Sequence, residues 1–345
     1  MTALRSTRAH DDARLMASDI RRLGLGDVRL DEDLRAYSRW RAGGRADLVV
    51  APRDKESVAR LLSYFYVRRI PWAVVGEGSN LFFDDAGVRT PLIQIGARLG
   101  AIQVRGNTVR AEAGAWAPAV ALKAMRAGLS GIEHTIGIPG TFGGLVLMNG
   151  GSLRQGIGEK ITEVEIAERD GSIRRISAHA CGFAYRRSTL QDRGAIVLGA
   201  SLELASHQRA PMRRRMIEIM ASRRRRFPRT LPNCGSVFVS DPALYATVGP
   251  PGAAIEMAGL KGARRGDAMV SPLHANFIVN LGAARSDDIL GLIQCVREAV
   301  ATRTGHRMRC EVRFMNAQGE VREVHDWLDD PAWRGAQPTV EAAHG

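Results

Sequence analysis

Residues 137–151 have the composition of a turn that could hold an anion. This stretch contains six glycines and one proline in fifteen residues. Glycine adopts positive φ and lets the backbone come close to a ligand, and Pro139 fixes one φ in the same turn. The backbone N–H groups of Gly140-Thr141-Phe142-Gly143-Gly144, followed by an apolar segment at 145–148, are therefore expected to bind a negatively charged group such as a phosphate.

A second glycine-rich turn, Gly76-Glu77-Gly78-Ser79-Asn80, follows the short apolar run at 72–75. Either turn alone is weak evidence, because most glycine clusters are plain turns. The second turn also lacks the GxGxxG spacing with which nicotinamide cofactors are bound at the start of a βαβ unit. Taken together, the two turns predict one large phosphate-bearing cofactor that is held from two sides.

These two turns resemble the flavin-binding half of the UDP-N-acetylenolpyruvoylglucosamine reductases. The resemblance extends over residues 35–316, and further motifs of that family follow in its order. They are Tyr-Arg-x-Ser at 185–188, Gly-Ser-Val-Phe at 235–238, Ala-Gly-Leu-Lys-Gly at 258–262, His-Ala-Asn-Phe-Ile-Val-Asn at 274–280 and Glu-Val-Arg-Phe at 311–314. The ordered set makes the resemblance specific, although no single motif would. The chain lacks the extra segment that one branch carries after the Tyr-Arg motif, so it looks like the compact branch.

The resemblance implies an enzyme in which NADPH reduces FAD, and the flavin then passes a hydride to the terminal vinyl carbon of UDP-N-acetylglucosamine enolpyruvate. The product would be UDP-N-acetylmuramate, a peptidoglycan precursor. Neither glycine turn contains a His or Cys, so FAD is expected to be non-covalent. The residues implied for FAD binding are Gly76, Glu77, Gly78, Ser79, Asn80, Leu81, Gly137, Ile138, Pro139, Gly140, Thr141, Gly143, Gly144 and Asn149.

The fold implied by the resemblance is α+β. It combines a two-lobed FAD-binding domain of the p-cresol methylhydroxylase/vanillyl-alcohol oxidase type with a C-terminal α/β substrate-binding domain. We expect the FAD-binding domain at 35–205, with lobes at about 35–90 and 91–205, and the substrate-binding domain at 206–318. A polar N-terminal extension at 1–34 and a tail at 319–345 complete the chain.

Three residues match the catalytic positions of the family. Arg186 is implied to bind the substrate carboxylate, Ser236 to deliver the proton and Glu311 to polarise the enolate that develops. Such an intermediate needs a cation and an acid nearby. From the residues alone, Arg186 would more often be a surface ion-pair partner, Ser236 a loop residue and Glu311 a salt-bridged strand residue.

Six further residues match positions that line the substrate. Arg313 is expected on the same strand and face as Glu311, because side chains alternate along a strand. Arg223 and Arg226 match basic residues that face the UDP diphosphate, whereas Lys261 and Asn276 fit structural roles equally well. The substrate-binding set is Tyr185, Arg223, Arg226, Lys261, Asn276 and Arg313.

One departure from the family keeps other functions open. The family usually continues with Lys-Asn-Pro after Gly-Ser-Val-Phe, but this chain has Val239-Ser240-Asp241-Pro242. A paralogue acting on a different enolpyruvyl or nucleotide-sugar substrate is therefore an alternative. A flavin oxidase that uses oxygen and a non-catalytic basic binding module are two further alternatives.

The composition sets limits on the class of protein. The chain has 345 residues, of which 45% are hydrophobic and 25% charged, as in a globular protein with a sizeable core. The net charge is +13, but only four of the 49 basic residues are lysines, and the arginine runs at 213–215 and 223–226 are not interleaved with aromatic residues. We therefore expect no nucleic-acid partner.

The cysteines and the apolar runs indicate a cytoplasmic protein. Cys181, Cys234, Cys295 and Cys310 lie far apart, without the spacing of a metal site, and suggest a reducing compartment. No apolar run is long enough to span a membrane, and the charged N-terminus is unlike a signal peptide. We expect a cytoplasmic monomer with no bound metal and no membrane partner.

Hydrophobic periodicity predicts alternating helices and strands. Helices are expected at 17–25, 55–67, 117–127, 142–148, 212–225, 254–260 and 287–302, and strands at 72–75, 92–95, 108–111, 161–167, 173–176, 195–204, 275–280 and 309–314. Asp170-Gly171 predicts a hairpin turn and Ser286 a helix N-cap. Beyond about His325 we expect a tail that is either loose or packed only at Trp327 and Trp333.

Overall fold

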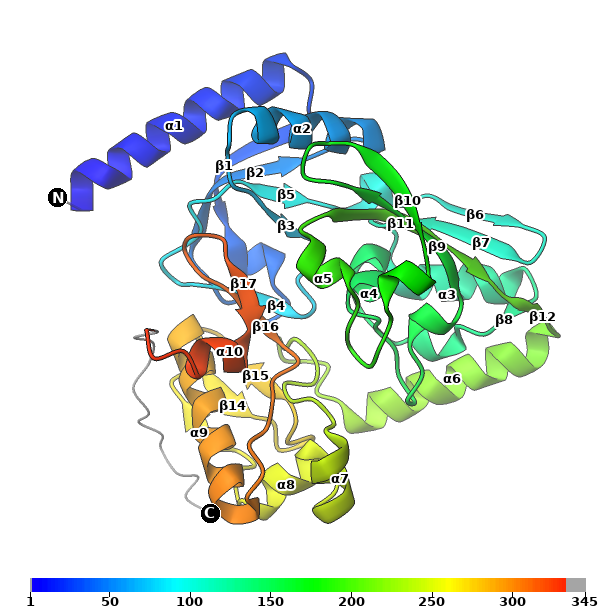
Figure 1. Ribbon diagram of the computed structural model, residues 1–345. Coiled ribbons are helices and arrows are strands. Elements are labelled where there is room, and N and C mark those ends of the chain that lie inside the picture. Colours follow the sequence, from blue (N-terminus) through cyan, green and yellow to red (C-terminus); the bar gives the residue numbers. More distant parts are fainter. Residues whose placement is uncertain (1, 333–345) are drawn as a thin grey trace. The chain divides into compact units, whose positions relative to one another are not determined.

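The computed structural model describes residues 2–332, and the chain forms two compact units from discontinuous segments (Figure 1). Unit 1 consists of residues 2–30, Asp47–Glu77 and Thr90–Arg223. Unit 2 consists of Asp31–Ala46, Gly78–Arg89 and residues 224–332. These units divide the chain differently from the continuous segments predicted at 35–205 and 206–318. The assignment of those segments as FAD-binding and substrate-binding domains stays a prediction.

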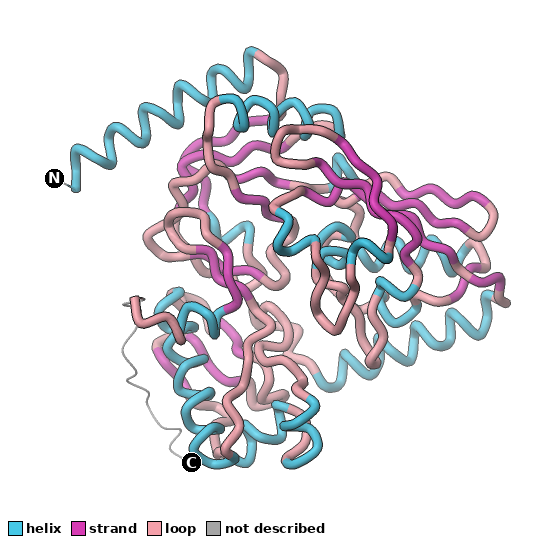
Figure 2. The backbone as a smooth tube through the Cα atoms, in the orientation of Figure 1, coloured by secondary structure: helices cyan, strands magenta, loops and turns pink. Residues whose placement is uncertain are grey.

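Unit 1 mixes helices with two main sheets (Figure 2). Its helices are α1 (Thr2–Arg22), α2 (Lys55–Val67), α3 (Ala117–Arg126), α4 (Phe142–Leu147), α5 (Leu190–Arg193) and most of α6 (Arg209–Arg226). Its strands are β3 (Ala73–Val75), β5 (Leu92–Gln94), β6 (Ile102–Arg105), β7 (Thr108–Glu112), β8 (Leu129–Ser130), β9 (Ile161–Ala167), β10 (Ile173–Ser177), β11 (Ile196–Glu203) and β12 (Ala205–Ser206). Strands β1 (Asp27–Asp33) and β2 (Arg45–Ala51) belong partly to each unit.

The two sheets differ in how they are built. One has the order β1-β2-β5-β3 and pairs β2 and β3 in parallel with β5, and most of β2 is buried, as is usual for a parallel strand. The other has the order β10-β9-β11-β7-β6 and is antiparallel throughout. The predicted hairpin at Asp170-Gly171 joins β9 to β10, with Ile173 opposite Ala167.

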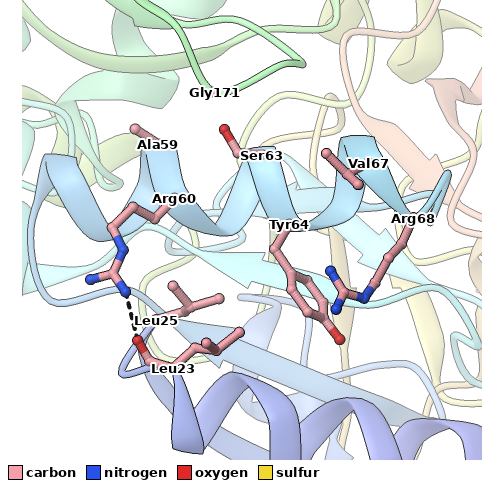
Figure 3. A pocket seen from close by; sticks show the side chains of 9 residues that line it. All are labelled: Leu23, Leu25, Ala59, Arg60, Ser63, Tyr64, Val67, Arg68 and Gly171. Atoms are coloured by element: carbon pink, nitrogen blue, oxygen red, sulfur yellow. Dashed lines mark hydrogen bonds between the residues drawn. The ribbon is translucent and has the colours of Figure 1, made fainter.

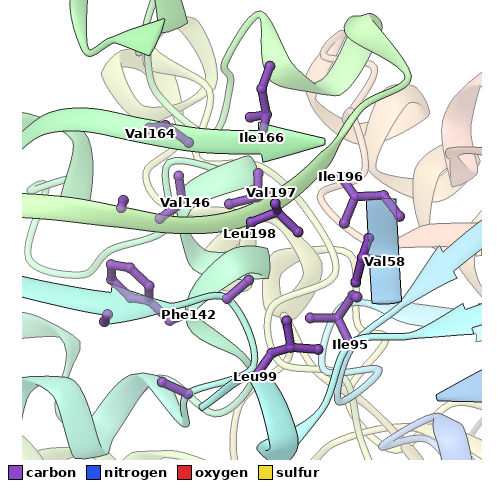
Figure 4. Close-up of a cluster of buried hydrophobic side chains, with 14 of the residues drawn as sticks. Val58, Ile95, Leu99, Phe142, Val146, Val164, Ile166, Ile196, Val197 and Leu198 are labelled. Carbon is purple, nitrogen blue, oxygen red and sulfur yellow. The ribbon is translucent and has the colours of Figure 1, made fainter. Parts of the chain in front are cut away.

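The core of unit 1 forms where α2 and α4 pack with these strands. Helix α2 begins after Asp54, whose carboxylate accepts a hydrogen bond from the Ser57 N–H. The buried side of this helix includes Val58 and Leu61. Phe142 and Val146 of α4 are fully buried and lie close to Leu198 of β11 (Figure 4). This packing fixes the segment that follows the glycine-rich turn.

Unit 2 has smaller sheets and its own core. Its helices are α7 (Pro242–Thr247), α8 (Pro251–Met257), α9 (Ser286–Thr304) and α10 (Val324–Leu328), and its strands are β4 (Leu81–Phe83), β13 (Arg264–Arg265), β14 (Ala268–Val270), β15 (Ile278–Asn280), β16 (Arg313–Met315) and β17 (Val321–Glu323). The sheets have the orders β13-β14-β15 and β17-β16-β4. Buried rings of Trp40, Phe82, Phe314 and Trp327 follow one another with centroids 5.0–6.1 Å apart. The segments 31–46 and 78–89 thus supply part of this core.

Most predicted elements are present, and α2 and β9 have the predicted bounds. The helix predicted at 17–25 is wrong in extent, because α1 begins at Thr2 and ends at Arg22. Ser286 is the first residue of α9 rather than its N-cap, which is Arg285. Within the described residues, no helix has the length and apolarity that a membrane crossing requires.

The predicted packing at Trp327 is confirmed, but the C-terminal segment is packed at further residues as well. Strand β17 pairs with β16, and the Trp327 indole, in α10, donates a hydrogen bond to the Phe314 carbonyl at 3.3 Å. Asp329 accepts two hydrogen bonds from Arg297 of α9. The chain is therefore packed to beyond Trp327, while Trp333 lies outside the described residues.

Candidate active site

The turn at 76–80 carries five successive backbone N–H groups that have no hydrogen-bond partner among the described residues. The chain passes from unit 1 to unit 2 between Glu77 and Gly78. Gly78 adopts a φ of 55°, in the left-handed region. Unengaged N–H groups beside such a residue are typical of a backbone nest for an anion.

Close contacts explain why glycine occupies two positions of this turn. A Cβ on Gly76 would lie 2.6 Å from Oγ1 of Thr141, within unit 1. A Cβ on Gly78 would overlap the Tyr37 carbonyl oxygen, within unit 2. The first contact brings Gly76 to Thr141, so the structure joins the two predicted glycine turns at this point.

In the second glycine turn, three of the backbone N–H groups that were predicted to bind an anion form hydrogen bonds within the protein. The N–H groups of Phe142 and Gly143 donate to the carbonyls of Ala115 and Ala113, each at 2.7 Å, and that of Gly144 donates to Thr141 Oγ1 at 3.3 Å. These three N–H groups cannot also bind an anion, which corrects the expectation for residues 140–144. The N–H groups of Gly140 and Thr141 have no partner among the described residues.

Arg186 sits in a tight turn with a constrained backbone. Ala184 and Arg187 exchange two backbone hydrogen bonds, and Arg186 between them has a φ of 55°. Its guanidinium donates to the Gly151 carbonyl at 2.8 Å. The Asn149 amide donates to the Ala184 carbonyl at 2.8 Å. The structure therefore connects the Tyr-Arg motif to the end of the second glycine turn.

Asn149 and Tyr185 have different surroundings. Asn149 is buried, and its Oδ1 accepts a hydrogen bond from the Gly158 N–H at 2.8 Å, so its side chain is held within the protein. Tyr185 is 54% exposed, and its ring lies 5.2 Å from the Arg186 guanidinium carbon. The roles of Asn149 in cofactor binding and of Tyr185 in substrate binding stay predictions.

His134 contributes to the same part of unit 1. Burial lowers the pKa of this histidine, and the positive charge of Arg186 acts in the same direction, against Glu159 and Glu133. Its Nδ1 accepts a hydrogen bond from the Ser152 N–H at 3.3 Å. A neutral His134 thus adds no positive charge beside Arg186. The sequence patterns gave no reason to select this residue.

In unit 2, the structure brings Asn80 to Glu311. The Asn80 amide donates to the Glu311 carbonyl at 2.9 Å, and the Arg313 N–H donates to the Asn80 carbonyl at 3.0 Å. The Glu311 N–H donates to the Val237 carbonyl at 2.7 Å, which places Glu311 opposite the residue that follows Ser236. The Ser236 hydroxyl is half-buried and makes no hydrogen bond to any described residue. Three predicted motifs therefore meet in one unit.

The prediction that Glu311 and Arg313 share a strand is wrong. Strand β16 begins at Arg313, and Glu311 lies in a bend between this strand and the isolated bridge that pairs Cys310 with Phe238. Strand alternation therefore does not determine the direction of the Glu311 side chain. The carbonyl and N–H contacts of Glu311 fix its backbone instead.

Asn276 supports the Ser236 segment from the other side. Its side-chain oxygen accepts from the Phe238 N–H at 2.9 Å, and its amide donates to the Phe238 carbonyl at 3.0 Å. The Asn276 carbonyl accepts from the Val237 N–H at 2.9 Å. With a side chain only 5% exposed, Asn276 has the contacts of a structural residue.

The predicted basic residues divide between the two units. Arg223 lies against the second glycine turn, because a Cβ on Gly137 would be 2.6 Å from its Nε. In unit 2, the Arg226 guanidinium carbon lies 5.8 Å from the Phe227 ring, and Lys261 pairs with Glu256 at 2.8 Å. The contact of Arg223 with Gly137 joins a predicted substrate residue to a predicted cofactor residue.

Two residues that the motifs did not reveal hold the start of strand β4. The Cys234 thiol donates to the Gly78 carbonyl at 3.5 Å, and the Ser38 hydroxyl donates to the Leu81 carbonyl at 2.9 Å. Burial raises the pKa of Cys234 to about 12, so its sulfur is a thiol at neutral pH. In the sequence, only the position of Cys234, two residues before Ser236, could have indicated that this cysteine lies near the predicted site.

The residues at the family departure begin a helix. Asp241 caps α7, because its carboxylate accepts from the Ala243 N–H at 2.9 Å, and Pro242 is the first residue of that helix. Both residue types are favoured at these positions. Local helix structure therefore accounts for the Asp-Pro pair.

A cavity of about 420 Å³ in unit 1 contains none of the predicted site residues (Figure 3). It lies beside α2 and is lined by Leu23, Leu25, Ala59, Arg60, Ser63, Tyr64, Val67, Arg68 and Gly171. The Arg60 guanidinium donates to the Leu23 carbonyl, and the Arg68 guanidinium carbon lies 4.0 Å from the Tyr64 ring centroid. Its arginines are thus engaged in local contacts.

Comparison with protein families identifies both halves of the chain. Residues 46–177 match an FAD binding domain, and residues 227–315 match the C-terminal domain of UDP-N-acetylenolpyruvoylglucosamine reductase. The N–H groups of Gly76, Glu77, Gly140 and Thr141, all in unit 1, have no partner among the described residues and are suited to the phosphate groups of FAD. The predicted α+β fold with these two kinds of domain is confirmed.

Similar proteins cover most of the chain. UDP-N-acetylenolpyruvoylglucosamine reductase 1 of Corynebacterium glutamicum is 44% identical over 297 residues, which are 86% of this chain and 89% of that protein. The enzyme of that name from Chloroherpeton thalassium is 36% identical, over 89% of this chain and 99% of its own. The crystal structure of the Thermus caldophilus reductase has a TM-score of 0.71 and 32% identity, and the match covers 84% of this chain and 98% of that one. The chain belongs to the UDP-N-acetylenolpyruvoylglucosamine reductase family.

Proposed function

We propose that this protein is an FAD-dependent oxidoreductase that converts UDP-N-acetylglucosamine enolpyruvate to UDP-N-acetylmuramate in peptidoglycan precursor synthesis, with NADPH as the hydride donor. Membership of the reductase family and the FAD-binding match support this function. Within the chain, the observation that carries the proposal is the pair of hydrogen bonds between Asn80 and the Glu311–Arg313 segment. They connect the turn with unengaged amides to the predicted acid.

The residues proposed to hold FAD are those of the two glycine turns. When bound, FAD supplies the hydride that it has received from NADPH. The amides of Gly76, Glu77, Gly140 and Thr141, all in unit 1, would bind its phosphate groups. Binding is non-covalent, since neither turn offers a His or Cys side chain.

The proposed chemistry adds a hydride to the terminal vinyl carbon and a proton to the neighbouring carbon. Arg186 binds the substrate carboxylate, for which its planar fork is suited, and stabilises the enolate. The Ser236 hydroxyl donates the proton to the neighbouring carbon, and it is available for this because it makes no hydrogen bond to the residues that the structure describes. Glu311 polarises the enolate from the segment opposite Ser236.

We further propose that Tyr185, Arg223, Arg226, Lys261, Asn276 and Arg313 line the substrate, with residues 35–205 binding FAD and 206–318 binding the UDP-sugar. The protein is proposed to be a cytoplasmic monomer. The four cysteines are free, which agrees with a reducing compartment.

An anaerobic absorbance experiment tests the function. The purified protein is reduced with NADPH and then mixed with UDP-N-acetylglucosamine enolpyruvate. We expect NADPH to bleach the flavin and the substrate to restore the oxidised spectrum rapidly. A protein that NADPH bleaches but this substrate does not restore would instead be a reductase for another enolpyruvyl or nucleotide-sugar substrate. Failure to bind FAD would overturn the proposal.

A further inference from the structure

The C-terminal helix α10 places an imidazole beside the segment that carries Glu311. His325 of α10 has a side chain only 13% exposed, and its Nδ1 accepts a hydrogen bond from the Cys310 N–H at 3.1 Å. Two neighbouring hydrogen bonds hold the same region, from the Val324 N–H to the Val312 carbonyl and from the Trp327 indole to the Phe314 carbonyl. The C-terminal segment therefore supports the chain on both sides of Glu311.

The Cys310 amide has no partner in the bridge with Phe238. That bridge is closed by hydrogen bonds from Val239 to Arg309 and from Glu311 to Val237. In an antiparallel pair of this type, the N–H of the opposed residue points away from the partner strand. His325 accepts this outward N–H, which belongs to the residue immediately before Glu311.

The surroundings of His325 fix which ring nitrogen carries the proton. Because Nδ1 accepts a hydrogen bond, the proton of the neutral ring is on Nε2. Nε2 lies 3.6 Å from a carboxylate oxygen of Glu323 and 3.6 Å from one of Asp326. These three side chains could be taken for a metal site. A protonated Nε2 offers no lone pair to a cation, so the cluster instead orients the imidazole.

We propose that His325 is a positioning residue for Glu311, which it holds in place through the Cys310 amide only while its imidazole is neutral. This inference rests on the role proposed above for Glu311. A second proton on Nδ1 would face the Cys310 N–H, and two donors cannot hydrogen-bond to each other. The Cys310 amide would then be released, and the Glu311 backbone, joined to Val237 and Asn80, would shift.

The charges around His325 act in opposite directions. Glu323, Asp326 and Asp329 favour its protonated form, whereas Arg297 of α9 and burial oppose it. Burial is the largest of these effects, and the pKa of His325 is lowered as a result. The ring is therefore neutral at pH 7, and its proton uptake belongs to the acidic range.

Two substitutions separate hydrogen bonding from titration. His325→Asn keeps an acceptor close to the position of Nδ1 but cannot take up a proton, whereas His325→Leu removes both the acceptor and the titration. We expect His325→Leu to slow flavin reoxidation by the substrate about 10- to 100-fold, as small misplacements of catalytic groups do. His325→Asn should recover most of that loss. His207→Leu, at an exposed histidine of unit 1, is the control.

Reduction of the flavin by NADPH and the FAD content serve as internal references. If His325→Leu lowers both of these as much as it lowers reoxidation, the residue is merely structural and the proposal is overturned. If His325→Asn is as slow as His325→Leu, the hydrogen bond to Cys310 is not what matters, and the proposal likewise fails.

The pH profile gives a second readout. The reoxidation rate of the unmodified protein should fall as the pH drops through the pKa of His325, and this decline should be absent in His325→Asn. Glu323→Gln removes a charge that favours protonation, so it should move the decline to lower pH. An unchanged acidic decline in His325→Asn would contradict the proposal.

Nuclear magnetic resonance of the ¹⁵N-labelled protein tests the geometry without substrate. We expect the Nε2–H tautomer for His325 at neutral pH and a change in the Cys310 amide resonance with the titration of the same ring. A protonated Nδ1 at neutral pH would overturn the inference. If instead the unmodified protein is not reoxidised by the substrate, the function proposed above fails, and that result is distinct from either outcome here.

Discussion

Arg186, a proposed site residue, occupies a backbone conformation that costs stability. A φ of 55° places an arginine in the left-handed region, at a cost of about 1–2 kcal/mol relative to the usual region. The turn is nevertheless held by hydrogen bonds from Asn149 and from Gln191, whose amide donates to the Arg186 carbonyl at 3.2 Å. Such strain at a fixed position is common at functional sites. Six other non-glycine residues of the described chain also have positive φ, so this conformation alone does not mark Arg186 as a functional residue.

Ser236→Ala tests the proposed proton donor. The substitution should leave NADPH-dependent flavin reduction unchanged, because the role proposed for Ser236 concerns only the substrate. Reoxidation by the substrate should slow about 10²–10³-fold, as when a single catalytic hydrogen-bond donor is removed. Stopped-flow absorbance measures both steps. Reoxidation at nearly the original rate would remove Ser236 from the mechanism.

Gly78→Ala tests the close approach at the first glycine turn. Its Cβ would overlap the Tyr37 carbonyl, and the φ of 55° is unfavourable for alanine. We expect the free energy of unfolding to fall by about 2 kcal/mol or more, together with FAD content. Gly262→Ala is the matched control, since Gly262 also has positive φ in unit 2 but no atom lies within 4 Å of an added Cβ. Equal losses in urea unfolding would mean that the contact with Tyr37 is unimportant.

At the scale of elements, the C-terminal segment β17–α10 is part of unit 2 and not an appendage. It adds a strand to β16 and encloses Arg297, which is 4% exposed. The Arg297 guanidinium donates to both carboxylate oxygens of Asp329, at 3.1 and 2.8 Å. Its Nε donates to the Met308 carbonyl at 2.9 Å. This arginine therefore connects α9, the approach to Glu311 and the end of α10.

Asp329→Ala tests this connection. It leaves the Arg297 charge buried without its carboxylate, which should lower the free energy of unfolding by about 2–3 kcal/mol, less than for a fully buried pair because Asp329 is partly exposed. Glu218→Ala, which breaks an exposed pair with Arg215, should cost less than about 1 kcal/mol. Urea unfolding at pH 7 measures both.

The loss of unfolding free energy in Asp329→Ala, compared with that in Glu218→Ala, should also depend on pH. The Arg297 guanidinium is the main cause that lowers the pKa of Asp329. The stability from the pair is therefore fully present above the unfolded pKa of about 3.9 and is lost as the pH falls through the folded pKa. A difference between the two variants that grew as the pH fell would contradict the assignment.

Across the whole molecule, one buried histidine, His134, and two half-buried ones, His274 and His325, link stability to pH. Burial is the main cause that lowers the pKa of His134, His274 and His325. Below about pH 6.5 the unfolded chain takes up protons at these residues that the folded chain does not. The contribution of these histidines to the free energy of unfolding is therefore fully present above this pH and is lost as the pH decreases through it.

We expect each of the three histidines to contribute up to about 1.4 kcal/mol per pH unit to this decrease. Urea unfolding between about pH 8 and 5 measures the slope, over a range in which histidines titrate. His274→Asn should reduce the slope, whereas His207→Asn, at an exposed position, should not. Stability that stays constant or rises as the pH falls from 7 to 5 would contradict the burial of these rings in neutral form.

The sequence by itself determined the local features of this protein. Hydrophobic periodicity over residues 55–67 predicted the bounds of α2, and Asp170-Gly171 predicted the β9–β10 hairpin. The family motifs gave the predicted site residues and the fold class. These features depend on residues near one another in the chain, so a local pattern is sufficient to reveal them.

Only the tertiary structure decided which distant segments meet. The carbonyls of Ala113 and Ala115 accept hydrogen bonds from the first two amides of α4. Fewer amides are therefore left for the anion than the glycine pattern predicted. Likewise, β16 begins at Arg313, and Glu311 is fixed by Asn80, by Val237 and, through Cys310, by His325. Every residue except proline has the same backbone N–H group, so the sequence does not show which acceptor a given N–H will bond. These pairings therefore depend on how the chain packs.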